Sequence, residues 1–171
     1  AIVLALVVLG FIVASALDAW AYAALWHHDA ESQDWSKALR SLGYWPTWIT
    51  VGIIFFLLDR RRTSFEWPLR DRWTRVVLLI VTTGLASLIA ELLKLITRRV
   101  RPELSDGVYA FRAIADRPLS TGGLGLPSSH TAMAFAAALI LARLHPLAAP
   151  IFLLAAVGCG LTRVVDRAHY V

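Results

Sequence analysis

The chain has 171 residues, which is enough for one domain. It is 58% hydrophobic and 17% charged, whereas a soluble domain is usually about half apolar and about a quarter charged. The formal net charge of +5 suits anionic lipid or phosphate, and no nucleic-acid-binding motif is present, so we expect no nucleic-acid partner. A disulfide within the chain is excluded, because Cys159 is the one cysteine.

The apolar residues lie in long runs, which is typical of membrane proteins. There are five such segments, at 1–26, 44–58, 76–97, 131–144 and 147–162. A helix needs about 20 residues to cross a bilayer, and the first and third segments are long enough alone. Five segments in one small chain predict an all-α fold, a polytopic bundle of membrane helices in a single domain over residues 1–171. Residues 1–16 could instead be a signal peptide, but no basic region supports that alternative.

The loop at 59–75 orients the predicted bundle. It carries six arginines with aromatic residues between them, which by the positive-inside rule indicates the cytoplasm. The N-terminus is then cytoplasmic, and the segment around 27–40, with His27 and His28, lies outside. The histidine pair is better explained as interfacial than as a metal site. The same count of segments brings three helix ends together at the outer face, near Thr97, His130 and Arg163.

Positive charge is concentrated at these helix ends, although the outer face of a membrane protein is normally poor in it. The cations are Lys94, Arg98, Arg99, Arg101, Arg163 and Arg167. Arginine forks and a lysine ammonium fit phosphate oxygens, so we interpret this face as an anion site. Of these residues, Arg98, Arg99 and Arg167 are expected at lipid headgroups rather than on substrate.

Local sequence signals refine the anion site. Pro102 should end the third helix at Arg101, with Lys94 on nearly the same helical face about 10 Å away. Ser128 or Ser129 is expected to cap the next helix, whose free N–H groups and dipole favour phosphate. Asp18 inside the first apolar segment is costly unless it is paired, by roughly 2.5–3.5 kcal/mol at a helix centre, so we expect it to have a structural role.

Two histidines, His130 and His169, accompany the cations. Imidazole exchanges protons near neutral pH and can attack phosphorus as a nucleophile. Phosphoryl transfer also needs cations around the equatorial oxygens, which the arginines supply. No HExxH or Cys/His metal spacing is present, so we expect neither a metal nor another cofactor.

Three motifs resemble those of the type 2 phosphatidic acid phosphatase family, which shares its site with vanadium haloperoxidases. The family pattern is K-x6-RP, then PSGH, then SR-x5-H-x3-D. Lys94 precedes Arg101-Pro102 by the family spacing, 127–130 reads PSSH, and 162–169 reads TRVVDRAH. Ser129 thus replaces the family glycine, and Thr162 replaces the serine. The last aspartate would fall after Val171, as would a sixth membrane helix that the family fold implies.

The resemblance implies a role for each matching residue. Lys94, Arg101 and Arg163 would hold the phosphate oxygens, and Ser128 with the backbone at Ser129 would add hydrogen bonds. His169 would be the nucleophile that forms a phosphohistidine. His130 would be the general acid for the leaving group.

These observations predict an integral membrane phosphatase. It would act without a metal on a lipid phosphate or diphosphate, at the outer face of a membrane that we expect to be the bacterial cytoplasmic membrane. Isoprenoid diphosphates and phospholipid phosphates both remain open, and the oligomeric state is not indicated. The loop 103–126 is long enough to cover the site as a flap. The alternative is a non-catalytic transporter or lipid-binding scaffold with a phosphate site.

Overall fold

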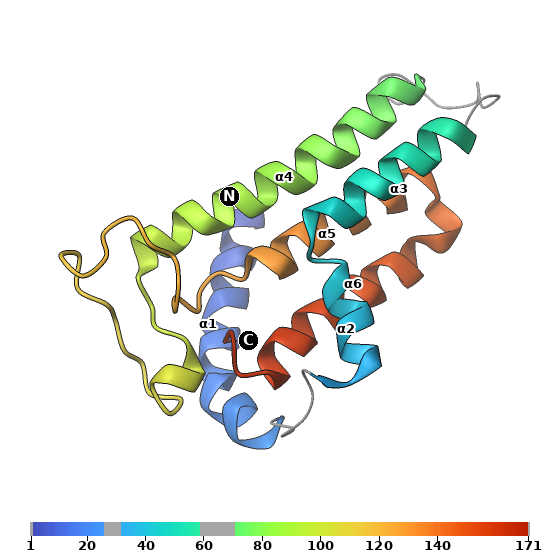
Figure 1. Cartoon of the computed structure of the whole chain (residues 1–171). Helices are drawn as coiled ribbons and strands as arrows, with labels where there is room; N and C mark the ends of the chain where they lie inside the picture. The colour runs from blue at the N-terminus through green and yellow to red at the C-terminus, as the bar shows by residue number, and fades with distance from the viewer. Residues whose placement is uncertain (1, 26–31, 59–70, 171) are drawn as a thin grey trace.

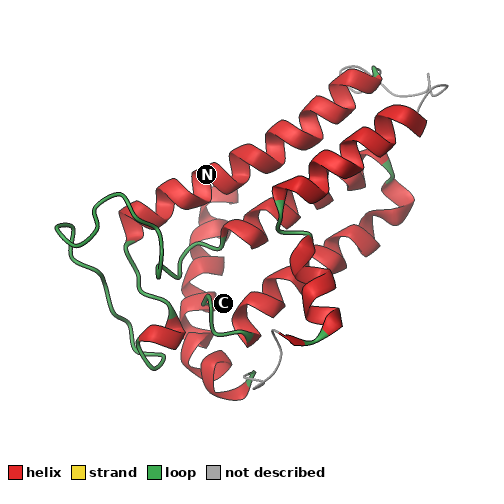
Figure 2. Ribbon diagram, in the orientation of Figure 1, coloured by secondary structure: helices red, strands yellow, loops and turns green. Residues whose placement is uncertain are grey.

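The computed structural model describes residues 2–25, 32–58 and 71–170, and this part of the chain is all helical (Figure 1 and Figure 2). The α-helices are α1 (Ile2–Ala24), α2 (Asp34–Ser41), α3 (Trp45–Leu58), α4 (Arg72–Thr97), α5 (Ser129–Leu144) and α6 (Ala149–Val165). Two short 3-10 helices lie between the α-helices: η2 (Pro102–Leu104) follows α4, and η3 (Pro146–Ala148) connects α5 to α6. Five α-helices coincide with the five apolar segments, which confirms the all-α prediction, and α2 is an addition to it.

The first turn of α4 contains arginines that we had assigned to the loop. The Asp71 side chain accepts a hydrogen bond from the Thr74 backbone N–H at 3.1 Å, so the helix begins at Arg72 and includes Arg75. The remainder of the arginine-rich loop, at 59–70, lies outside the described residues, as do His27 and His28. The predicted orientation in the membrane therefore remains a prediction.

The C-terminal end of α4 differs from the prediction. The helix stops at Thr97, because Arg98 adopts a left-handed conformation with φ of 50°. Arg101 is already extended, with φ of −63° and ψ of 145°. The expectation that Lys94 and Arg101 share one helical face is therefore wrong, and the loop geometry rather than helical spacing places Arg101.

Helix α5 lies at the centre of the bundle, where it packs against α4 on one side and α6 on the other (Figure 1). Alanines at 134, 137 and 138 let the neighbouring helices approach closely. Larger side chains fill the rest of the core, with Trp48, Leu79 and Met133 around Ala137. Helix α3 packs on α4, and α2 packs on α6.

Two helical stretches are long and apolar enough to cross a membrane by themselves, at 72–97 and 146–165. The bent pair of α2 and α3, with a 67° angle between them, would be a third span if it crosses as one unit. Helix α5 and the apolar part of α1 at 12–24 are shorter. Large apolar side chains are exposed on the candidate spans, as a lipid-facing surface requires, among them Leu85, Leu88, Ile96, Ile151 and Leu154.

We predict that Leu79→Ala destabilises the bundle by about 2–5 kcal/mol, because Leu79 is fully buried and its truncation leaves a cavity. Leu85→Ala on the same helix is the matched control, since Leu85 is 50% exposed. Thermal unfolding of both variants in the same detergent measures the difference. Equal losses of stability would contradict this core.

Candidate active site

Three segments far apart in the sequence meet at one end of the bundle. The Lys94 ammonium, near the end of α4, donates to Ser129 Oγ, at the start of α5, at 3.3 Å. Thr97 Oγ1 donates to the Leu126 carbonyl at 2.6 Å. His169, after α6, bonds through Nδ1 to the Gly125 carbonyl at 2.9 Å. The structure thus brings together the three motif segments that the sequence predicted to meet.

Lys94 is buried, with 5% of its surface exposed, and holds two contacts. Besides Ser129 Oγ, it contacts Glu91 Oε1, one turn earlier in α4, at 2.6 Å. An ammonium has three N–H donors, and these contacts use two of them. Ser129, at the family's glycine position, therefore helps to fix the lysine head group.

The loop after α4 pairs with the loop before α5 through backbone hydrogen bonds. Gly125 N–H donates to the Arg99 carbonyl at 2.8 Å, and Arg101 N–H donates to the Gly123 carbonyl at 3.0 Å. A Cβ at Gly125 would lie 2.9 Å from Arg101 Cα, so a larger residue there would push the two segments apart. This close approach sets the Gly125 carbonyl against His169.

The contact with Gly125 decides the tautomer of His169. A carbonyl oxygen only accepts, so Nδ1 must carry the proton, which leaves the lone pair on Nε2. Burial lowers the pKa of His169 to about 3, and although the Gly125 bond raises it, the positive charges of Arg163, Lys94 and Arg101 lower it further. The imidazole is therefore neutral near pH 7, as a nucleophile must be.

His130 is the second residue of α5, whose N-cap is Ser128. The Ser128 side chain accepts from the Thr131 backbone N–H at 3.3 Å, which decides the capping residue between the two serines. His130 Nε2 is buried and, within the described part of the chain, has no hydrogen-bond partner. The positive charges of Arg163, Arg40 and Lys94 act on this imidazole. The charges of Arg163 and Lys94 also interact with the His169 imidazole, so these two cations lie near both histidines.

The two remaining predicted phosphate ligands each have a carboxylate neighbour. Arg163 is buried and lies 3.3 Å from Asp166 Oδ2. Arg101 is about one-third exposed and lies 3.4 Å from Glu103 Oε1. Each guanidinium has five N–H donors, more than a single carboxylate contact uses.

Two of the arginines expected at lipid headgroups, Arg98 and Arg167, contact other parts of the protein. Arg98 is buried, and its guanidinium donates to the carbonyls of four residues in the following loop, which are Arg112, Ala113, Asp116 and Pro118. Arg98 therefore fixes part of the loop that we had expected to act as a flap. Arg167 lies over the Tyr22 ring at 4.0 Å and donates to the Tyr22 carbonyl.

Arg99 is the partner that Asp18 requires. Its Nη2 lies 2.8 Å from Asp18 Oδ2, and both side chains are buried. The guanidinium lies over two aromatic rings that meet edge-on, 3.8 Å from the centroid of Tyr109 and 3.4 Å from that of Tyr170. The Tyr109 hydroxyl also donates to Asp18, at 2.9 Å. This aromatic-acidic clamp of Asp18, Arg99, Tyr109 and Tyr170 joins α1 to the segment that carries His169.

No group of three or more His, Cys, Asp or Glu side chains that could hold a metal occurs among the described residues. The site is instead a set of cations around two imidazoles, with a backbone carbonyl fixing one of them. Such a site can bind an anion and offers one nitrogen lone pair to it.

Comparison with known proteins places the chain in a family. The model of the PAP2 superfamily matches residues 75–171, more than half of the chain and all three motif segments, and the chain belongs to this superfamily. Members of the superfamily generally hydrolyse phosphate esters. No curated protein and no solved structure matches the chain.

Removing the buried ion pair of the clamp should lower the free energy of unfolding. Asp18→Asn is expected to destabilise the protein by about 3–5 kcal/mol, because it leaves the Arg99 charge buried without its carboxylate. The double variant Asp18→Asn, Arg99→Gln should lose less than the sum of the two single variants. Chemical unfolding in detergent of the four proteins in this cycle measures the coupling. Additive losses would show that the two side chains do not interact.

The His169 tautomer can be tested by NMR with ¹⁵N-labelled histidine. An ordinary imidazole, with a pKa of about 6.5, is mostly protonated at pH 5. The pKa of His169 is lowered to about 3, so as the pH falls its neutral form should persist through pH 5, with the proton on Nδ1. The resonance is assigned by its loss in His169→Gln. Titration near pH 6.5 would contradict the geometry.

Proposed function

We propose that the protein is an integral membrane phosphatase that hydrolyses a lipid phosphate or diphosphate through a phosphohistidine on His169. The observation that supports this most directly is the contact between His169 Nδ1 and the Gly125 carbonyl, because it leaves the Nε2 lone pair of a neutral imidazole available for attack. The Nε2 lone pair attacks phosphorus, and the bond to the leaving oxygen breaks. His130 protonates that oxygen. Water then attacks the phosphohistidine and gives a proton back to His130, which releases phosphate and restores both histidines.

The cations stabilise the transition state in this mechanism. Charge builds up on the equatorial phosphate oxygens during transfer, and Lys94, Arg101 and Arg163 offer donors to them. The Ser128 cap and the backbone N–H groups at the start of α5 add the positive end of a helix dipole. No step requires a metal in this scheme.

We also propose that more helices cross the membrane than the two or three that are long and apolar enough by themselves. We propose a bundle in which α1, α3, α4, α5 and α6 all cross the bilayer, with the site at the outer face of a bacterial cytoplasmic membrane. The exposed apolar side chains of α4 and α6 support lipid contact. A site at the level of the headgroups would let a lipid phosphate enter while its tail stays in the bilayer.

The test is phosphate release by the purified protein in detergent, in EDTA, over a panel of lipid phosphates. We expect release by the wild type and a loss of at least about a thousandfold in His169→Ala, because the nucleophile is removed. His145→Ala is the matched control, since His145 lies at the far end of α5, against Phe55. No release by the folded wild type would favour the transporter or scaffold alternative.

A further inference from the structure

The C-terminal end of α2 lies against His130, although α2 precedes the segment that the superfamily model matches. A Cβ at Gly43 would come within 2.5 Å of His130 Cβ, so glycine is needed for this contact. The Tyr44 ring meets the His130 ring edge-on, with centroids 4.9 Å apart. Helix α2 is held in place by its packing on α6, where Leu39 contacts Gly158.

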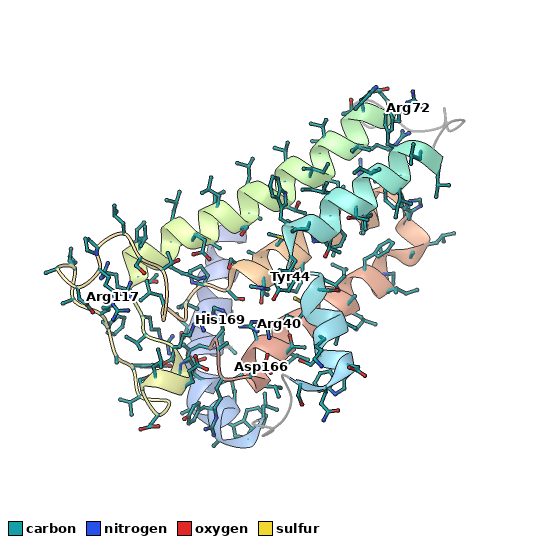
Figure 3. The ribbon with its side chains drawn as sticks, in the orientation of Figure 1. Arg40, Tyr44, Arg72, Arg117, Asp166 and His169 are labelled. Atoms are coloured by element: carbon teal, nitrogen blue, oxygen red, sulfur yellow. The ribbon has the colours of Figure 1, made fainter. Side chains whose placement is uncertain are left out.

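This placement brings one more cation to the site. Arg40 is in the last turn of α2, three residues before Gly43, and its charge acts on the His130 imidazole together with those of Arg163 and Lys94. Figure 3 shows Arg40, Tyr44, Asp166 and His169 in the same region of the bundle. Arg40 also interacts with other groups of the protein. Its five N–H donors allow it to keep such contacts while it binds an anion.

The side of the transferred phosphate on which Arg40 lies can be inferred from the proposed function, on which this inference rests. If His130 protonates the leaving oxygen, then the leaving group lies on the His130 side of the transferred phosphate. Arg40 is the cation that α2 adds on that side. A leaving group with its own negative charge would benefit from it, whereas an uncharged alcohol would not.

We propose that Arg40 is a further substrate-binding residue, which contacts the second phosphate of a lipid diphosphate on the leaving-group side of the site. In the reaction, His169 Nε2 bonds to the terminal phosphorus, and the bond from that phosphorus to the bridging oxygen breaks. The bridging oxygen leaves as part of the lipid monophosphate and takes its proton from His130. Water completes the cycle and releases inorganic phosphate. Arg40 holds the departing monophosphate throughout the first step.

The experiment compares an isoprenoid diphosphate with the monophosphate of the same chain length. Arg40→Gln should lower kcat/KM for the diphosphate by about 10- to 100-fold, the usual effect of a lost hydrogen bond to a charged group, and change that for the monophosphate by less than about threefold. Arg40→Lys should recover part of the loss. Lys37→Gln is the control, because it removes an exposed charge from the same helix. Thermal unfolding checks that all variants fold. Equal losses with both substrates, or no loss with either, would overturn the proposal.

A binding measurement separates this proposal from the proposed function. Inorganic diphosphate and inorganic phosphate are titrated calorimetrically into His169→Ala, with and without Arg40→Gln. Weaker binding of diphosphate alone supports the Arg40 site even if the wild type releases no phosphate from any lipid. Unchanged binding of diphosphate in Arg40→Gln refutes the site even if the protein is an active phosphatase.

Discussion

The buried ion pair between Asp18 and Arg99 is the interaction on which the arrangement of this site depends. A carboxylate in an apolar helix is unfavourable without a partner, and Arg99 supplies one at 2.8 Å. The guanidinium is then fixed further by the rings of Tyr109 and Tyr170. Because Tyr170 follows His169 directly, the pair that anchors α1 also limits where the His169 imidazole can lie. One polar cluster thus determines both the packing of the first helix and the geometry of the last segment.

The cations of this region divide into two groups by their partners. Arg98 and Arg99 are bound by the protein itself, through loop carbonyls and Asp18, and each is about 95% buried. Lys94, Arg101 and Arg163 have carboxylate neighbours, and their positive charges lower the pKa of His169. The carboxylates keep the substrate-free site from holding several unbalanced positive charges. A phosphate can then bind by sharing donors with them rather than by entering an uncompensated cluster.

Much of this architecture could be predicted from the sequence. Apolar runs predicted the five longer helices, and the count of these segments predicted that Lys94, His130 and His169 lie at one end of the bundle. What failed depended on tertiary contacts. Helix α2 is short and polar, so no apolar run marks it. The spacing of Lys94 and Arg101 suggested a continuing helix, but Arg98 ends it because four carbonyls from the loop hold its guanidinium. Asp18 did signal a structural pairing, although nothing in the sequence named Arg99.

A sequence can reveal the features of the site that depend on spacing along one segment, but not those that depend on contacts between segments. A spacing such as that from Arg163 to His169 fixes the positions of side chains along one segment. It does not reveal that the Gly125 carbonyl faces His169 Nδ1, because that contact depends on the close backbone pairing of two loops. The same holds for Arg40, which reaches the site through the packing of α2 on α6. The cations and histidines of the candidate site can therefore be found from motifs, whereas the groups that contact them from other segments are set by the fold.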